Sequence, residues 1–198
     1  MRQCKMFLAL TGSIVLFGAM TTSATARELT VSGFAWEAHF REITFQGAFG
    51  RARCFLTLHG SLHSRTIRKV AGTLVGFIDA VIRGSCAEGA ATILSETLPW
   101  HIKYTGFSGR LPDITSMRSD IIGWSVRIRE GIAPACLARS TAAEPVTLSI
   151  VASRGELIET SIGGSIRTGA ECGGSTGTYS GTSSFERASG GFIVISLI

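Results

Sequence analysis

The chain has 198 residues, of which 45% are hydrophobic and 17% are charged, and its formal net charge at pH 7 is +5. This composition is too apolar for an intrinsically disordered protein. The positive charge is mild and is not gathered into a basic stripe with interleaved aromatic residues, which argues against a nucleic-acid-binding protein.

Residues 1–26 have the pattern of a secretory signal peptide. Arg2 and Lys5 form a short basic start, residues 6–20 are apolar, and Ala24-Thr25-Ala26 is a small-x-small cleavage site. The apolar run is shorter than the roughly 20 residues that span a bilayer. We therefore expect cleavage after Ala26 and a secreted, periplasmic or other cell-envelope location.

Residues 27–198 are expected to form one secreted domain with a formal net charge of +3, because Arg2 and Lys5 leave with the signal peptide. The longest remaining apolar run, residues 70–82, is interrupted by Asp79, so no transmembrane segment is expected in the mature chain. The charge favours an anionic envelope surface as a partner. Local basic groups are interpreted as solvated strand faces: Arg51/Arg53, Arg65/Arg68/Lys69 and Arg127/Arg129.

Four cysteines remain after cleavage: Cys54, Cys86, Cys136 and Cys172. An even number in an oxidising compartment predicts two disulfides, for which three connectivities exist. The pairing Cys54–Cys86 with Cys136–Cys172 is favoured because it closes the shorter loops. Zinc is not expected, since the chain has no Cys-x-x-Cys pair.

Alternation of apolar and polar residues predicts antiparallel strands with one buried face. The apolar positions are, in chain order, Cys54, Leu56 and Leu58; Trp100, Ile102 and Tyr104; Ile122, Trp124, Val126 and Ile128; and Val146, Leu148 and Ile150. Residues 66–78 fit either a helical face or a kinked strand. The strand is favoured there, because Gly72 and Gly76 would each cost a helix about 1 kcal/mol.

Gly, Ser and Thr make up 22 of the 37 residues from 155 to 191, as in a flexible linker. We instead expect short strands and turns over residues 173–189, because residues 191–198 form an apolar C-terminal strand that should pair with the sheet. The predicted fold class is all-β: a single-domain antiparallel β-sandwich or small β-barrel with two disulfides.

No catalytic residue, metal site or cofactor is predicted. The histidines (His39, His59, His63, His101) and nearby carboxylates (Glu37, Glu42, Asp79, Asp113) have no spacing that brings them together. A serine-hydrolase triad could use Asp79, Asp113 or Asp120, but the chain has no Gly-x-Ser-x-Gly motif. The acid pairs Glu88/Glu96 and Glu156/Glu159 are interpreted as solvated surface groups.

Trp100, at a strand start after Leu98-Pro99, is interpreted as a core anchor. The alternative is that Trp100, Tyr104 and Trp124 line a site for a hydrophobic ligand. A filled interior and an open cavity would distinguish these two roles.

One arrangement of motifs resembles a known group. Cys54 begins the stretch Cys-Phe-Leu-Thr-Leu-His-Gly, and Cys86 precedes the stretch Thr-Leu-Pro-Trp that ends at Trp100. The stretch Thr-Gly-Phe-Ser-Gly follows at residues 105–109, and Cys136 comes after it in Ala-Cys-Leu-Ala. This order, over roughly residues 50–140, is similar to small secreted bacterial proteins grouped with the activators of alkane oxidation. It is also similar to uncharacterised secreted proteins of high-GC soil bacteria. The resemblance implies a secreted β protein linked to surfaces or hydrophobic compounds, and carries over no catalytic residue.

The sequence therefore predicts a secreted or envelope protein that is not an enzyme and that binds a hydrophobic molecule, a polymer or a partner. Two alternatives stay open: a secreted hydrolase with a site assembled from distant loops, and a purely structural surface module.

Overall fold

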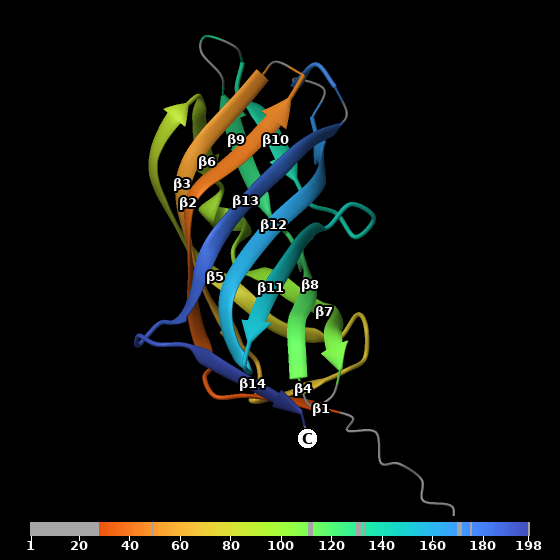
Figure 1. Cartoon of the computed structure of the whole chain (residues 1–198). Coiled ribbons are helices and arrows are strands. Elements are labelled where there is room, and N and C mark those ends of the chain that lie inside the picture. Colours follow the sequence, from red (N-terminus) through yellow and green to blue (C-terminus); the bar gives the residue numbers. More distant parts are fainter. Residues whose placement is uncertain are drawn as a thin grey trace, which may run out of the picture.

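The computed structural model describes residues 28–48, 50–110, 113–129, 132, 134–169, 172–174 and 176–197, so the predicted signal peptide and its cleavage site lie outside the described residues. Within these ranges the chain forms antiparallel strands and one short 3₁₀ helix (Figure 1). The predicted all-β class is confirmed. The elements are β1 (Glu28–Val31), β2 (Ala35–Gly47), β3 (Gly50–Leu62), β4 (Thr66–Arg68), β5 (Leu74–Glu88), β6 (Ala90–Ile93), η1 (Ser95–Thr97), β7 (Trp100–Arg110), β8 (Asp113–Ile122), β9 (Ser125–Arg129), β10 (Cys136–Arg139), β11 (Val146–Ser153), β12 (Glu156–Thr168), β13 (Thr176–Arg187) and β14 (Ile193–Leu197).

Eight strands pair in a closed circuit, which we call the ring. Each of β2, β3, β5, β7, β8, β11, β12 and β13 pairs antiparallel with the next of these strands along the chain, and β13 pairs back with β2. Both predicted architectures, a sandwich and a small barrel, bury one face of each strand. The inside of the ring is that buried face, and the predicted apolar positions of β3, β7 and β11 are buried there.

The prediction of one continuous strand over residues 122–129 is wrong in one respect. The run divides into β8 and β9 at Gly123, whose φ is +91°, a left-handed conformation that glycine adopts without strain. The bend takes β9 out of the ring and into a second group of strands, in which β6 pairs β9, β9 pairs β10, and β10 pairs β12. The bend also shifts the buried position: Ile121 is buried before Gly123 and Trp124 is buried after it, whereas the predicted core residue Ile122 is only half-buried.

A small sheet, which we call the cap, lies at the lower end of the ring in Figure 1. It consists of β1 between β4 and β14, and β14 also pairs with β12. The predicted C-terminal strand and its pairing with the sheet are therefore confirmed. The favoured strand over residues 66–78 is right in type but not continuous, since a turn containing Gly72 at φ +86° separates β4 from β5.

Residues 173–189 form one long strand in place of the predicted short strands, because β13 runs unbroken over twelve residues, with turn residues on either side. The Thr residues and most Ser residues of β13 are exposed, whereas Tyr179, Ser183 and Phe185 are buried. Its glycines allow close approach to β2: a Cβ on Gly181 would lie 2.8 Å from the Glu42 carbonyl oxygen. The Gly/Ser/Thr composition therefore reflects a tightly packed, hydroxyl-faced strand.

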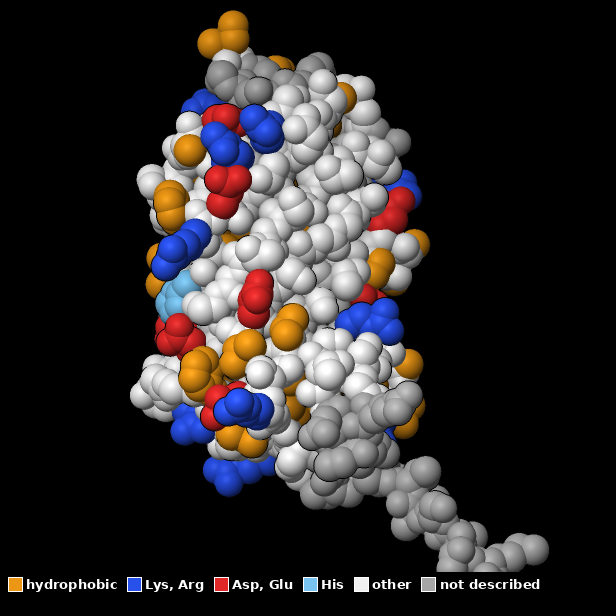
Figure 2. Space-filling model, viewed as in Figure 1, with side chains coloured by type: hydrophobic (Ala, Val, Ile, Leu, Met, Phe, Trp, Pro, Cys, Tyr) orange, Lys and Arg blue, Asp and Glu red, His pale blue; other side chains and the backbone are white. Residues whose placement is uncertain are grey.

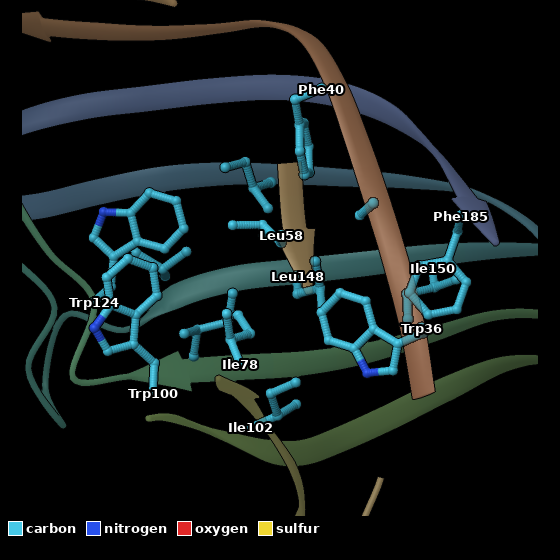
Figure 3. Close-up of a cluster of buried hydrophobic side chains, with 14 of the residues drawn as sticks. Trp36, Phe40, Leu58, Ile78, Trp100, Ile102, Trp124, Leu148, Ile150 and Phe185 are labelled. Carbon is cyan, nitrogen blue, oxygen red and sulfur yellow. The ribbon is translucent and has the colours of Figure 1, made fainter. Parts of the chain in front are cut away.

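Large apolar side chains fill the inside of the ring (Figure 3). Trp36 stacks on Phe185 with ring centroids 5.2 Å apart, and Trp100 packs against Trp124 at 4.7 Å. The Tyr179 hydroxyl accepts a hydrogen bond from the Thr147 amide and donates one to the Gly163 carbonyl, each at 2.7 Å. Its burial raises the pKa of the Tyr179 hydroxyl, which stays protonated and holds β13 to β12 and β11.

Both disulfides are those favoured from the sequence. Cys54–Cys86 joins β3 to β5, and Cys136–Cys172 joins β10 to the segment that follows β12. The part of the chain that the structure describes contains no helix long and apolar enough to cross a membrane.

Candidate functional site

The three aromatic residues considered as ligand contacts lie in the core. Trp100 and Trp124 are 0% exposed and Tyr104 is 2% exposed. The Trp100 indole nitrogen donates to the Thr97 hydroxyl at 2.8 Å, so this side chain is held at both its apolar and polar ends. Four hollows on the described surface are lined by other residues, on the outer faces of the strands and at the cap.

A carboxylate and two histidines meet on the outer face of β2 and β3. Glu37 lies 3.3 Å from His39 Nε2 through one oxygen and 3.3 Å from His59 Nδ1 through the other. His39 Nδ1 is also 3.3 Å from the Thr57 hydroxyl. Sequence spacing missed this cluster, because only the pairing of Glu37 with His59 across the two strands creates it.

Among the described residues no histidine hydrogen-bonds to a serine, and the hydroxyl that meets a histidine in this cluster is that of Thr57. The same residues contain no group of three or more side chains suited to holding a metal ion. Asp120 faces Lys103 across β8 and β7, and burial raises the pKa of its carboxyl while Lys103 lowers it. The side chain of Asp113 lies outside the described ones.

Glu88 is the centre of an ion-pair group at the other end of β5. Arg51 Nε donates to it at 2.9 Å and Arg53 Nη2 at 2.8 Å, while Arg53 Nη1 also reaches Glu42 at 3.4 Å. The hydrogen bond from Arg51 is the main reason that the pKa of Glu88 is lowered. Glu88, one member of the sequence pair Glu88/Glu96, is thus paired with two arginines.

Glu88→Gln is expected to lower the melting temperature at neutral pH. A carboxyl whose pKa is lowered by folding stabilises the folded state above its unfolded-state pKa, and this contribution disappears as the pH falls through the folded-state pKa. The difference in melting temperature between wild type and variant should therefore disappear on acidification and become smaller in high salt. Glu156→Gln, at an exposed carboxylate without an ion pair in the described structure, is the matched control. A difference that persists unchanged into acid would contradict the assignment.

The cap and the neighbouring turn combine basic and exposed apolar side chains. We call this set the basic–apolar end; Figure 2 shows basic and hydrophobic groups together at the lower end of the visible face. It consists of Phe34, Arg65, Arg68, Lys69, Val70 and Leu74. Phe34, Val70 and Leu74 are 41%, 61% and 47% exposed, whereas most large apolar side chains of the described chain are buried.

Local contacts hold these basic groups in place. The Arg65 guanidinium lies 5.3 Å from the centroid of the Phe34 ring, and the Lys69 ammonium lies 5.4 Å from that of Phe107. Arg68 approaches Glu28 at 3.7 Å, but its side chain remains 78% exposed. Arg65 and Arg68 are therefore exposed and Lys69 is half-buried, and their surroundings are partly apolar.

A hollow of about 500 Å³ opens between the cap and the start of β5. Polar and apolar side chains both line it. The lining residues are Glu28, His63, Ser64, Thr66, Ile67, Arg68, Thr73, Leu74 and Val75. One guanidinium, one imidazole and three hydroxyls in one concavity can donate hydrogen bonds to phosphate oxygens.

Comparison of the chain with models of protein families, with curated protein sequences and with solved structures found no match.

Proposed function

We propose that this protein is an exported, non-enzymatic binding protein that attaches to an anionic lipid surface of the cell envelope through its basic–apolar end. The observation that carries the proposal is the juxtaposition of Arg65, Arg68 and Lys69 with the exposed Val70 and Leu74. Neither group alone would suffice, because scattered exposed residues of either kind are ordinary.

The two kinds of side chain serve two parts of a lipid surface. A cation next to anionic headgroups contributes about 1 kcal/mol, and this attraction weakens with salt. Exposed apolar side chains enter the boundary between headgroups and acyl chains, where their surface leaves water. The hollow beside Arg68 offers hydroxyl and guanidinium donors to a headgroup phosphate.

The other properties of the chain agree with this role. Two disulfides suit an oxidising compartment, to which the expected signal peptide would export the protein. The aromatic candidates for a small-molecule pocket are packed in the core, which favours a surface over an internal ligand. Among the ligands expected from the sequence, namely a hydrophobic molecule, a polymer or a partner, these properties favour a lipid surface.

The test is co-sedimentation with vesicles of phosphatidylglycerol, compared with vesicles of phosphatidylcholine. We expect binding to the anionic vesicles only. The double variant Arg68→Gln/Lys69→Gln should bind about 30-fold more weakly, since it removes two contributions of about 1 kcal/mol. Val70→Ser/Leu74→Ser should also weaken binding, with less dependence on salt.

The matched control is Arg127→Gln/Arg129→Gln, which removes two exposed arginines from β9, outside the cap. It should bind like the wild type. Equal binding to both kinds of vesicle would refute the proposal. So would an equal loss of binding in Arg68→Gln/Lys69→Gln and in the control Arg127→Gln/Arg129→Gln, because these residues would then not form the contact.

A further inference from the structure

Strand β5 is paired on both sides only along its first part. Leu74–Ile78 lies between β3 and β7, and the pairing with β7 ends where Ile78 faces Trp100. From Asp79 to Glu88 the strand pairs with β3 alone among the described residues. We call residues 79–88 the β5 edge.

An edge of this kind presents backbone N–H and C=O groups that can pair with another chain. Nothing in the described structure covers it: Asp79, Ala80, Ile82, Arg83, Gly84 and Ser85 are all exposed. Its far end is anchored, because the Cys54–Cys86 disulfide ties it to β3. The edge is therefore both open and held in an extended conformation.

Exposed apolar side chains lie beside the edge on its outer face. Ile82 is 58% exposed and Phe55 on β3 is 48% exposed. Phe55 packs over Gly84, where an added Cβ would lie 2.8 Å from the Phe55 Cβ. Both residues border a hollow of about 210 Å³. Burying this surface would favour association.

Two charges on the edge have no ion-pair partner in the described structure. Asp79 makes no salt bridge, and the Arg83 guanidinium only donates to the neighbouring Gly84 carbonyl at 3.1 Å. They lie two residues on either side of Val81. If two such strands pair antiparallel about a twofold axis at Val81, each Asp79 faces the Arg83 of the other strand, and each Ile82 faces Ala80.

We propose that the β5 edge is a self-association site, at which it pairs antiparallel with the same edge of a second copy of this chain. We infer a second copy as the occupant because, in this pairing, opposite charges face each other and apolar residues face each other. The ladder covers residues 79–83 of each copy, and Phe55 flanks it. Such an interface is isologous and closes as a dimer.

The test is analytical ultracentrifugation of the purified, disulfide-bonded protein over a range of concentrations. The wild type should dimerise reversibly. Arg83→Asp places two carboxylates opposite each other, and Asp79→Arg places two guanidinium groups opposite each other. Each single variant should weaken dimerisation by about 10-fold or more, because like charges directly opposite on paired strands repel. The double variant Asp79→Arg/Arg83→Asp restores the complementarity and should dimerise like the wild type.

Arg118→Asp, a charge reversal at an exposed position on β8, is the matched control and should leave dimerisation unchanged. Thermal unfolding checks that every variant is folded. Amide hydrogen exchange supplies a second measurement, since residues 79–83 should become protected as the concentration rises. A wild type that stays monomeric into the millimolar range, or a double variant as weak as the singles, would overturn the proposal.

Discussion

Trp124→Ala is expected to lower the free energy of unfolding by about 3–5 kcal/mol, the usual loss for a large buried aromatic side chain. Trp124 is fully buried, and its ring lies 4.7 Å from that of Trp100, 6.3 Å from Tyr179 and 6.5 Å from Phe45. Trp100, Tyr179 and Phe45 lie on three different strands, and Trp124 lies between β8 and β9. The cavity left by truncating Trp124 would therefore loosen contacts among several strands at once.

Urea denaturation of the disulfide-bonded protein measures this loss. Trp124→Phe is the informative companion: it keeps an aromatic ring and removes an indole N–H that is buried without a hydrogen-bond partner in the described structure. It should cost clearly less than the alanine variant. Phe192→Ala, at a side chain 47% exposed, should change stability by less than about 1 kcal/mol.

The result also separates the two roles that the sequence allowed for this residue. A core anchor loses stability when truncated, whereas a side chain lining a ligand mouth is dispensable for folding. A change below about 1 kcal/mol for Trp124→Ala would contradict the core assignment.

The strands were predictable because a strand with one buried face has a side-chain period of two. The alternate residues Cys54, Leu56 and Leu58 are all buried in β3. The same holds in β11 for Val146, Leu148 and Ile150. The disulfide pairing was favoured from the sequence because it closes the shorter loops, and the sheet agrees with it. Cys54 pairs directly with Cys86 in the β3–β5 ladder.

Alternation in the sequence does not specify which residues pair across two strands, or which strands close the ring. The pairing of β13 with β2 joins residues more than 130 positions apart, and no local pattern encodes it. The meeting of Glu37 with His59 depends on the same kind of information. The β5 edge exists because the pairing of β5 with β7 ends where Ile78 faces Trp100, so the end of the apolar run of residues 70–82 is exposed.

The basic–apolar end illustrates the same limit for function. Arg65, Arg68 and Lys69 are visible in the sequence as a local group, for which a solvated face was the simplest interpretation. The closeness of Arg65 to Phe34 depends on the packing of the cap, in which the Val31 amide donates a hydrogen bond to the Arg65 carbonyl. The group of charges is visible in the sequence, but the exposure of Val70 and Leu74 beside it is not.

Removal of the Cys54–Cys86 disulfide, by Cys54→Ser/Cys86→Ser, is expected to cost about 3–4 kcal/mol. The bridge closes a loop with a sequence separation of 32, and the chain-entropy account of disulfides assigns a loop of this size a loss in that range. The Cys136–Cys172 bridge, with a separation of 36, has nearly the same entropic value and is the matched control. Global stability should therefore fall by similar amounts in the two double variants.

The local consequences should differ, because only Cys54–Cys86 anchors a strand that is paired on one side. In the Cys54→Ser/Cys86→Ser variant, amide hydrogen exchange should accelerate along residues 79–88 more than in the strands of the ring paired on both sides. In Cys136→Ser/Cys172→Ser the same amides should exchange as in the wild type under native conditions. Equal acceleration in both variants would mean that β3 alone holds the β5 edge, and that the disulfide contributes only through the unfolded state.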